Sequence, residues 1–420
     1  MTDVTLDHFN PFNEAVQQCP HPYYREMQRQ TPAFQVEGTN LYLITRHELI
    51  TPILRDTTTF SNNFGAVGDM PSGDVVDQIK DVVAQGWPPV ATMLTVDPPA
   101  HTRYRGTVAT YFTPRRMAEL RGPVEQIVHR LIDALPSEAF DFVTAFAVPL
   151  PIEAIALVLN VPTDRMADFK RWSDDSIANI GSVISDERRI ESFKGILEFQ
   201  HYFAEQIERR RSEPCGDLMS DLVIAEIDDG NGGKRPLNMA EMLSIVQQLL
   251  VAGNETTTKA LTEAMRLLAE HPHVWAKLQA DPAGYAPLVT EEVLRLSTPT
   301  QGMFRVVTAD TEIDGVPIAK GSRLVLFYTA ANRDPKVWGD DPDRFDPDRP
   351  NLKEHLAFGK GIHFCLGAPL SRVEMQVALE VLATRLGSIS LTDDNDFRYH
   401  PSFMLRGLVS LGVQVERRNA

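Results

Sequence analysis

The sequence predicts a mainly α protein with a minor β region, folded as one domain over residues 1–420. Helical patterns follow one another from Asp97 to about Leu296, which indicates a large helical core. Strand-like segments are short and lie on either side of this helical part. No internal repeat, low-complexity run or linker divides the chain, so we expect one domain rather than two or three.

The N-terminal quarter predicts small elements and one long loop. YYREMQRQ indicates a short helix, Leu41 to Arg46 a strand, and HELITPILRD a second helix. Residues 62–96 contain seven Gly and Pro residues and predict an irregular loop around a short helix. A loop of this length inside a compact domain is usually functional.

The longest helix is expected from about Asn238 to Glu270. Asn238 and Glu241 have the spacing of a capping box, and a rise of 1.5 Å per residue makes the helix about 50 Å long. Its centre, VAGNETTT, is poor helix sequence, because Gly253 costs about 1 kcal/mol relative to Ala and β-branched threonines are stiff. We therefore expect a kink or a widening there.

The C-terminal third predicts short strands at FRVVT, TEIDGVPI and SRLVLFYTA, then an irregular segment rich in Pro and Asp over residues 334–350. The sequence LGAPLSRVEMQVALEVLATRL indicates a long helix, and the chain ends in a short β-like segment.

Composition excludes several classes of protein. The net charge of −16 disfavours nucleic acid and anionic membranes as partners. The N-terminus does not resemble a signal peptide, and no apolar run of about 18 residues predicts a membrane anchor. The three cysteines are widely separated, which fits no disulfide framework or zinc site and favours the reducing cytoplasm.

The stretch AFGKGIHFCLG, residues 357–367, places Cys365 among glycines at the start of the last long helix. A helix N-terminus offers free N–H groups and a partial positive charge, which hold a thiolate deprotonated. Gly359, Gly361 and Gly367 permit unusual backbone angles and close approach. A buried structural cysteine is the alternative, and for a cysteine without this context it is the better one.

The pattern F-G-x-G-x-H-x-C-x-G is complete, with Phe358, Gly359, His363, Cys365 and Gly367 in their places. It resembles the haem-thiolate loop of the cytochromes P450. The resemblance implies the mostly helical P450 prism fold, haem b (iron protoporphyrin IX) as the cofactor, and Cys365 as the ligand of the iron.

The centre of the longest helix resembles the oxygen-binding groove of that family, A-G-x-[DE]-T. Ala252 and Gly253 then lie against the haem, while Glu255 and Thr256 deliver protons to bound oxygen. Ala252 and Thr256 are four residues apart and share a face. Without the cysteine loop, a helix contact with threonines bonded back to carbonyls is an equally good interpretation.

Two further motifs become informative with the cysteine loop. Glu292 and Arg295 in EEVLRL lie three residues apart, which alone indicates a surface ion pair. By resemblance they join Arg349 in the Glu–Arg–Arg cluster, which holds the segment before the cysteine loop. In VDPPAHTRYR, Asp97 is expected to cap a helix that begins at Pro98.

The expected partners of the haem propionates share one property, in that each can bind a carboxylate. His101 and Arg105, four residues apart, lie on one helix face, although a plain polar face is the alternative. The full set implied by the resemblance is His101, Arg105, Arg305 and His363.

The resemblance implies a monooxygenase, an oxidoreductase that inserts one oxygen atom from O2 into an organic substrate by hydroxylation. No flavin or reductase sequence lies within these residues, so a separate ferredoxin, served by a ferredoxin reductase, is the expected electron donor. Arg115, Arg116, Lys360 and Arg372 predict a basic docking face for it near the cysteine loop.

The expected substrate is a lipophilic small molecule, for example a terpenoid, a steroid or a fatty acid. Flexible methionines suit an adaptable apolar pocket. The resemblance implies that the pocket is lined by Trp87, Met93, Leu94, Val251, Ala252, Pro299, Met303, Phe403 and Met404.

Two other functions fit the cysteine loop. One is a peroxide-driven haem-thiolate enzyme, and the other is a haem protein that senses or carries ligands without catalysis. Both are disfavoured by the intact pair Glu255 and Thr256. Consumption of NAD(P)H with ferredoxin partners distinguishes the three functions.

Overall fold

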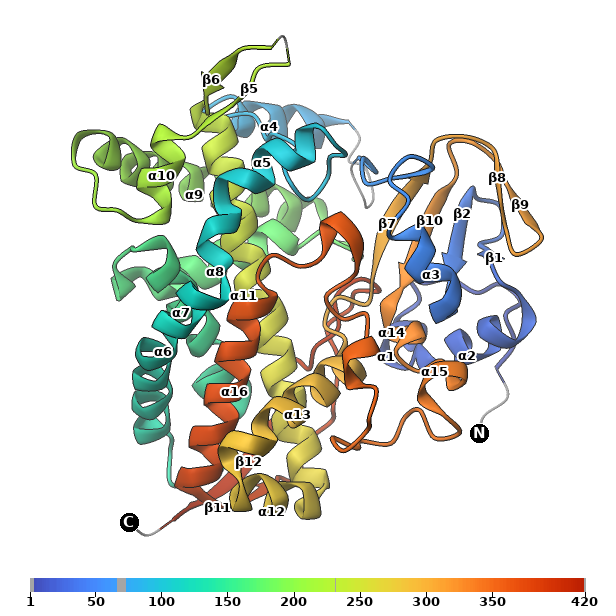
Figure 1. The fold of residues 1–420 in the computed structure, drawn as a ribbon, viewed down its shortest axis with the longest axis vertical. Coiled ribbons are helices and arrows are strands. Elements are labelled where there is room, and N and C mark those ends of the chain that lie inside the picture. The colour runs from blue at the N-terminus through green and yellow to red at the C-terminus, as the bar shows by residue number, and fades with distance from the viewer. Residues whose placement is uncertain (1–3, 66–72, 231, 419–420) are drawn as a thin grey trace.

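The computed structural model describes residues 4–65, 73–230 and 232–418, and these form two regions (Figure 1). Helices packed around the long helix α11 make up the larger region, and a smaller β-rich region lies beside it. The predicted fold class, mainly α with a minor β region, is confirmed. Residues 66–72 of the predicted long loop lie outside the described residues.

The first elements build much of the β-rich region, and the last two of them pack on the helical region. They are α1 Glu14–Gln18, α2 His21–Gln30, β1 Phe34–Gln35, β2 Leu41–Ile44, α3 His47–Ile53, β3 Phe60–Ser61, α4 Asp74–Val83 and α5 Ala100–Val108.

The middle of the chain is helical. Its elements are η1 Ala109–Phe112, α6 Pro114–Ala134, β4 Phe140–Asp141, η2 Val143–Ala147, α7 Pro149–Leu159, η3 Thr163–Arg165, α8 Met166–Ile177, α9 Asp186–Ser212, α10 Leu218–Ile224, β5 Glu226–Asp228, β6 Lys234–Pro236, α11 Met239–Glu270, α12 Pro272–Ala280 and α13 Pro282–Ser297.

The last third returns to the sheet and then ends on a long helix. Its elements are β7 Gly302–Val307, β8 Thr311–Ile313, β9 Val316–Ile318, β10 Arg323–Phe327, α14 Tyr328–Ala331, α15 Pro335–Trp338, η4 Leu352–Glu354, η5 Gly361–His363, α16 Ala368–Arg385, β11 Leu386–Leu391 and β12 Gly412–Arg417.

Helix α11 crosses the helical region and begins with the predicted capping box. The Asn238 side chain accepts from the Glu241 N–H, and the Glu241 carboxylate accepts from the Asn238 N–H. The expected widening at its centre is wrong, because Met239–Glu270 is continuous α-helix. Most residues of this helix are buried, and their packing stabilises the helix more than the weak helix propensity of the central residues destabilises it.

The main sheet has the strand order β1-β2-β10-β7-β3. Strand β10 pairs in parallel with β2 and antiparallel with β7, which places Leu324 opposite Arg305. A second sheet joins β11, β12 and β4 near the C-terminus. The main sheet therefore brings the segment that carries Arg305 beside the helical region.

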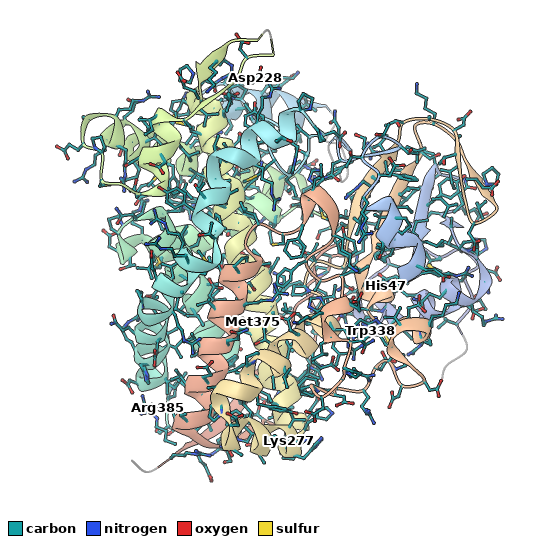
Figure 2. The ribbon with its side chains drawn as sticks, viewed as in Figure 1. His47, Asp228, Lys277, Trp338, Met375 and Arg385 are labelled. Atoms are coloured by element: carbon teal, nitrogen blue, oxygen red, sulfur yellow. The ribbon has the colours of Figure 1, made fainter. Side chains whose placement is uncertain are left out.

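The largest hydrophobic cluster lies among α6, α7, α11, α13 and α16. Met375 of α16 is fully buried in it (Figure 2). Helix α16 packs on both α6 and α13, so the residue at its N-terminus is attached to a rigid support. No helix in the described ranges is long and apolar enough to span a bilayer.

Two local expectations differ from the structure. The segment Tyr328–Ala331, expected to continue a strand, is the helix α14. Residues Glu226–Asp228 and Lys234–Pro236, expected to be helical, pair as a hairpin. Both are short elements whose conformation depends on packing and turns rather than on a long periodic pattern.

Candidate active site

The cysteine loop is held by its own main chain and by two glycines. The Cys365 N–H donates to the Phe358 carbonyl at 2.9 Å, which folds the loop back on itself. Gly359 and Gly361 both have positive φ. A Cβ at Gly361 would lie 2.4 Å from the Leu54 carbonyl oxygen, so only glycine fits between the loop and α3.

Cys365 lies half-buried ahead of α16. Burial raises the pKa of its thiol, while the Gly367 N–H, the charge of Arg105 and the Ala368 N–H oppose the increase. These groups all favour a thiolate at this place. Gly367 has a φ of −80°, and a Cβ there would meet no protein atom within 4 Å.

Helix α5 packs against the cysteine loop through the expected residues. The Arg105 guanidinium donates to the Phe364 carbonyl at 2.7 Å, and the rings of His101 and His363 lie 4.3 Å apart. Burial, followed by the nearby His101 and Arg305, lowers the pKa of His363 to about 3. Burial, followed by the charge of Arg105, also lowers the pKa of His101, and the buried Nε2 of each ring has no hydrogen-bond partner.

Arg305 reaches the same place from strand β7. Its side chain is 2% exposed and interacts with the Tyr328 hydroxyl and, through charge, with Asp97. The expected cap at Asp97 is wrong, since α5 begins at Ala100 and Pro99 precedes it. The Asp97 carboxylate instead accepts from the Ser61 hydroxyl and from the Asn62 N–H.

The centre of α11 has an uncovered face. Ala252 is exposed, and Val251, Gly253 and Thr256 are half-buried, although the helix crosses the core. The Thr256 hydroxyl donates back to the Ala252 carbonyl at 3.0 Å. A Cβ at Gly253 would lie 3.3 Å from Ile155 of α7, so this glycine faces α7.

The two helices of the site meet beside Thr256. The Thr257 hydroxyl bonds to the Ser371 hydroxyl at 3.2 Å, and Ser371 lies in the first turns of α16. The uncovered face of α11 thus lies close to the helix start that carries Cys365.

Glu255 belongs to a buried ion network that the sequence did not indicate. Its carboxylate lies 2.6 Å from the Lys259 ammonium and 3.5 Å from that of Lys170 on α8. Lys170 also pairs with Asp174. Burial raises the pKa of Glu255, but Lys259 and Lys170 outweigh it and lower the value to about 2. Lys259, four residues after Glu255, was the one available sequence signal.

These residues fit a haem. A half-buried thiol with N–H donors suits the iron, and two orphaned imidazole nitrogens with two arginines suit the carboxylates of a porphyrin. Gly367 leaves open space although its backbone does not require glycine. Cys365 would therefore hold the iron, and His101, Arg105, Arg305 and His363 would hold the propionates.

The expected pocket residues form two groups. The Gln301 N–H donates to the Met404 carbonyl at 2.7 Å, which brings the segment from Pro299 to Met303 beside Phe403 and Met404. In the second group Leu94 is exposed and Met93 is buried, and their loop joins α11 by a hydrogen bond from Gln248 to Thr92.

Trp87 lies half-buried on α9, where its carbonyl accepts from Gln200 at 2.9 Å. Its ring meets His201 edge to face. Trp87 is thus anchored to α9 at the beginning of the segment that joins α4 to α5.

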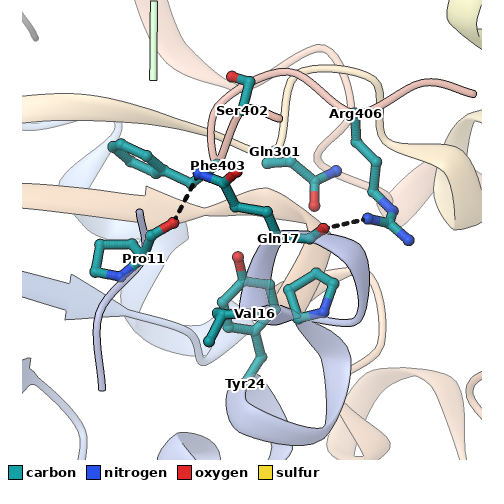
Figure 3. A pocket seen from close by; sticks show the side chains of 9 residues that line it. Pro11, Val16, Gln17, Tyr24, Gln301, Ser402, Phe403 and Arg406 are labelled. Atoms are coloured by element: carbon teal, nitrogen blue, oxygen red, sulfur yellow. Dashed lines mark hydrogen bonds between the residues drawn. The ribbon is translucent and has the colours of Figure 1, made fainter. Parts of the chain in front are cut away.

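The turn that carries Phe403 rests on the N-terminal helix α1. Figure 3 shows a small cavity behind Phe403, where the Arg406 guanidinium donates to the Gln17 carbonyl at 2.8 Å. The ring of Phe12 lies 5.1 Å from that of Phe403. This support fixes one wall of the expected pocket.

The Glu–Arg–Arg cluster is present and buried. Arg295 makes two bonds to the Glu292 carboxylate, at 2.6 and 2.7 Å, and Arg349 approaches the carboxylate to 3.5 Å. Arg295 also donates to the carbonyls of Asn332 and Pro342 and lies over the ring of Trp338, which Figure 2 labels. The cluster therefore fastens residues 334–350 to α13.

The expected basic face is only partly free. Arg372 pairs with Glu291 at 2.6 Å and covers the ring of Phe358, and Lys360 lies 3.5 Å from Glu354. Arg115 and Arg116 are exposed at the start of α6. Arg116 lies over the ring of Tyr111 and lines a surface cavity together with Cys215 and Asp217.

Comparisons with known proteins show the family of the chain. The family model described as Cytochrome P450 matches residues 182–386. 6-Deoxyerythronolide B hydroxylase of Saccharopolyspora erythraea is 38% identical over 77% of this chain and 78% of its own length. Nocardicin C N-oxygenase of Nocardia uniformis is 35% identical over 96% of this chain and 97% of its own. The structure of CYP109Q5 from Chondromyces apiculatus covers 98% of this chain and 99% of its own, with a TM-score of 0.83 and 36% identity.

The fold and the cysteine loop define a haem-thiolate protein. The chain belongs to the cytochrome P450 family. It is accordingly a monooxygenase, an oxidoreductase that uses a haem-thiolate cofactor, O2 and a redox partner.

Proposed function

We propose that this monooxygenase oxygenates a lipophilic small molecule, holds haem b on Cys365 and receives electrons from a separate ferredoxin in the cytoplasm. The carrying observation is the position of the half-buried Cys365 at the start of α16, next to the uncovered centre of α11. A haem bound there supplies the oxygen-activating chemistry of a thiolate-ligated iron.

The residues of the chain take distinct roles in this proposal. Thr256 presents a hydroxyl on the uncovered face of α11, where it would hold a water molecule and relay a proton through its Oγ1. Because Lys259 and Lys170 lower the pKa of Glu255 to about 2, Glu255 takes up a proton from the solvent side only when its carboxylate moves away from these lysines. Asp174, at the outer end of this network, lies nearest the solvent.

The lipophilic character of the substrate is supported by the residues near the uncovered face. Leu94, Val251 and Met303 are incompletely covered by protein, and apolar side chains of this kind bind apolar surface. The ferredoxin is supported by the exposed Arg115 and Arg116 at the start of α6, because acidic partners are guided by local positive charge.

Replacement of Thr256 tests the proposed function. With a ferredoxin, its reductase and a substrate that shifts the haem spectrum, Thr256→Ala is expected to consume NAD(P)H while forming at least about tenfold less product, since proton transfer contributes at least about 10²-fold. The electrons from NAD(P)H that no longer lead to product are expected to reduce O2 to hydrogen peroxide or water. Thr256→Ser keeps the hydroxyl and serves as the control. Unchanged product per NAD(P)H in Thr256→Ala would remove Thr256 from the reaction.

A further inference from the structure

Helix α11 carries a stripe of incompletely covered side chains that extends well beyond the centre of the site. Its members follow helical spacing and are Ser244, Gln247, Gln248, Val251, Ala252 and Thr256. Residues four apart lie on one face of a helix, so Gln248, Ala252 and Thr256 form a single line. The stripe changes from apolar and small beside Thr256 to polar two turns before it.

Gln248 differs from the other polar members in having a buried polar atom without a partner. Its Nε2 donates to the hydroxyl of Thr92, which is fully buried in the loop before α5. Its Oε1 is buried and has no hydrogen-bond partner. Reversing the amide only exchanges the unpaired oxygen for an unpaired NH2 group. An unpaired buried group of this kind costs about 1–3 kcal/mol.

The neighbouring polar residues serve as tethers. The Ser244 hydroxyl accepts from the Val90 N–H at 3.0 Å, and Gln247 donates to the Ser176 hydroxyl of α8 at 2.9 Å. These bonds fasten the loop and α8 to α11 in the turn that precedes Gln248. The amide of Gln248 is thus held by Thr92 through its Nε2, while its Oε1 has no hydrogen-bond partner.

We propose that Gln248 is a specificity residue that hydrogen-bonds a hydroxyl group of the substrate. This inference rests on the proposed function, because it places the substrate along the face of α11 that leads to Thr256. A hydroxyl group can donate to the amide oxygen or accept from the amide NH2 group, so either orientation of Gln248 binds it. The substrate is then a lipophilic alcohol rather than a plain hydrocarbon.

The geometry also fixes where that hydroxyl lies on the molecule. Gln248 and Thr256 are eight residues apart, which is about 12 Å along the helix axis. The hydroxyl of the substrate therefore lies about that far from the carbon that is oxidised, and the apolar skeleton spans the distance beside Val251 and Ala252. A site built to bond a hydroxyl rejects the analogue that lacks it more strongly than an apolar pocket rejects a methylene group.

Paired ligands test this inference by titration of the haem spectrum. Dodecane with 1-dodecanol and androstane with androstanol differ by one hydroxyl, and both alcohols are long enough to reach from Gln248 toward Thr256. We expect the wild-type holoenzyme to bind at least one alcohol about tenfold or more tightly than its hydrocarbon, since tenfold corresponds to about 1.4 kcal/mol. Gln248→Met, which keeps the length of the side chain, should abolish this preference.

Further variants separate specificity from stability. Thr92→Val leaves the amide of Gln248 without its anchor and should reduce the preference, so it carries the test if Gln248→Met does not fold. Gln85→Leu changes an exposed glutamine, which bonds only to the Asp81 carbonyl through its side chain, and should match the wild type.

The outcomes distinguish this inference from the proposed function. The role of Gln248 is overturned if the wild-type protein binds no alcohol more tightly than the matching hydrocarbon. The same holds if it binds neither compound of any pair. The same result follows if Gln248→Met weakens alcohol and hydrocarbon equally. A reduced protein that lacks the spectrum of a thiolate-bound carbon monoxide complex instead refutes the proposed function itself.

Discussion

Two buried glutamates near the site are expected to differ in charge, because their surroundings differ. Glu255 faces two lysines, which keep it ionised. Glu374 of α16 is 1% exposed and lies beside Thr257. Burial raises the pKa of Glu374 well above its ordinary value of 4.5, although the interaction with the Thr257 hydroxyl acts to lower it. One residue type thus carries charge in one position and a proton in the other.

Glu374→Gln should remove a pH dependence of stability. Because the pKa of Glu374 is raised in the folded protein, stability falls as pH rises above about 4.5 toward the folded value. The slope for one proton is at most about 1.4 kcal/mol per pH unit. Gln cannot titrate, so the variant should lose this slope and be the more stable protein at neutral pH.

Urea unfolding of the holoenzyme from about pH 5 to about pH 8 measures this difference. Glu270→Gln, at the exposed pair with Arg266, is the control and should keep the wild-type slope. Equal slopes for wild type and Glu374→Gln would show that Glu374 is ionised in the folded protein.

At the scale of elements, the Glu292 carboxylate connects α13 to the irregular segment before the cysteine loop. Besides the arginines, it accepts from the Asp346 N–H at 2.9 Å. Glu292→Ala leaves two arginines buried without their counterion, which costs about 3–5 kcal/mol. We expect loss of folded protein or of bound haem rather than a change in turnover.

The ratio of haem to protein after purification, together with thermal unfolding, measures this effect. Glu270→Ala removes an exposed partner of Arg266 and should change stability by no more than about 0.5 kcal/mol. A stable Glu292→Ala protein with full haem content and altered turnover would contradict a structural role.

The sequence predicted the elements that carry long patterns. Helix α11 agrees within a residue with the range expected from its capping box and its periodicity, and α16 follows the cysteine loop as expected. The hairpin of β5 and β6, with strands of three residues, was missed because so short a segment has no clear period. Asp97 was misassigned because its carboxylate bonds to β3, which no local pattern reveals.

The site was predictable to the extent that its residues lie in motifs. The cysteine loop and the Glu292–Arg295 pair are local patterns, and the structure gives both a defined place. Lys170 could not be found, because it reaches Glu255 from another helix 85 residues away in sequence. The orphaned amide of Gln248 likewise depends on the loop that contains Thr92.

At the scale of the whole molecule, an acidic protein of net charge −16 must attract its electron donor through local charge. We propose that Arg115 and Arg116 supply that charge, although Arg115 lies 3.6 Å from Glu119. Charge steering is screened within about 8–10 Å at ordinary ionic strength. Transfer of the first electron from an acidic ferredoxin should therefore slow as salt rises.

Arg115→Glu combined with Arg116→Glu should slow this transfer about tenfold or more at low salt, with substrate affinity unchanged. Stopped-flow reduction under carbon monoxide measures the rate. Arg29→Glu combined with Lys320→Glu makes the same change in net charge at exposed residues of the β-rich region and is the matched control. If the rate changes neither with salt nor with the substitutions at Arg115 and Arg116, the electron donor binds to another face of the protein.

The central claim, that Cys365 is the thiolate ligand of a haem, is tested most directly by the spectrum of the reduced carbon monoxide complex. The wild-type protein is predicted to show the red-shifted Soret band of a thiolate-bound complex, and Cys365→His should lose this band even where haem is retained. Cys215→Ser, at an exposed cysteine, should keep it. A wild-type protein without the red-shifted band, or a Cys365→His protein that retains it, would contradict the assignment.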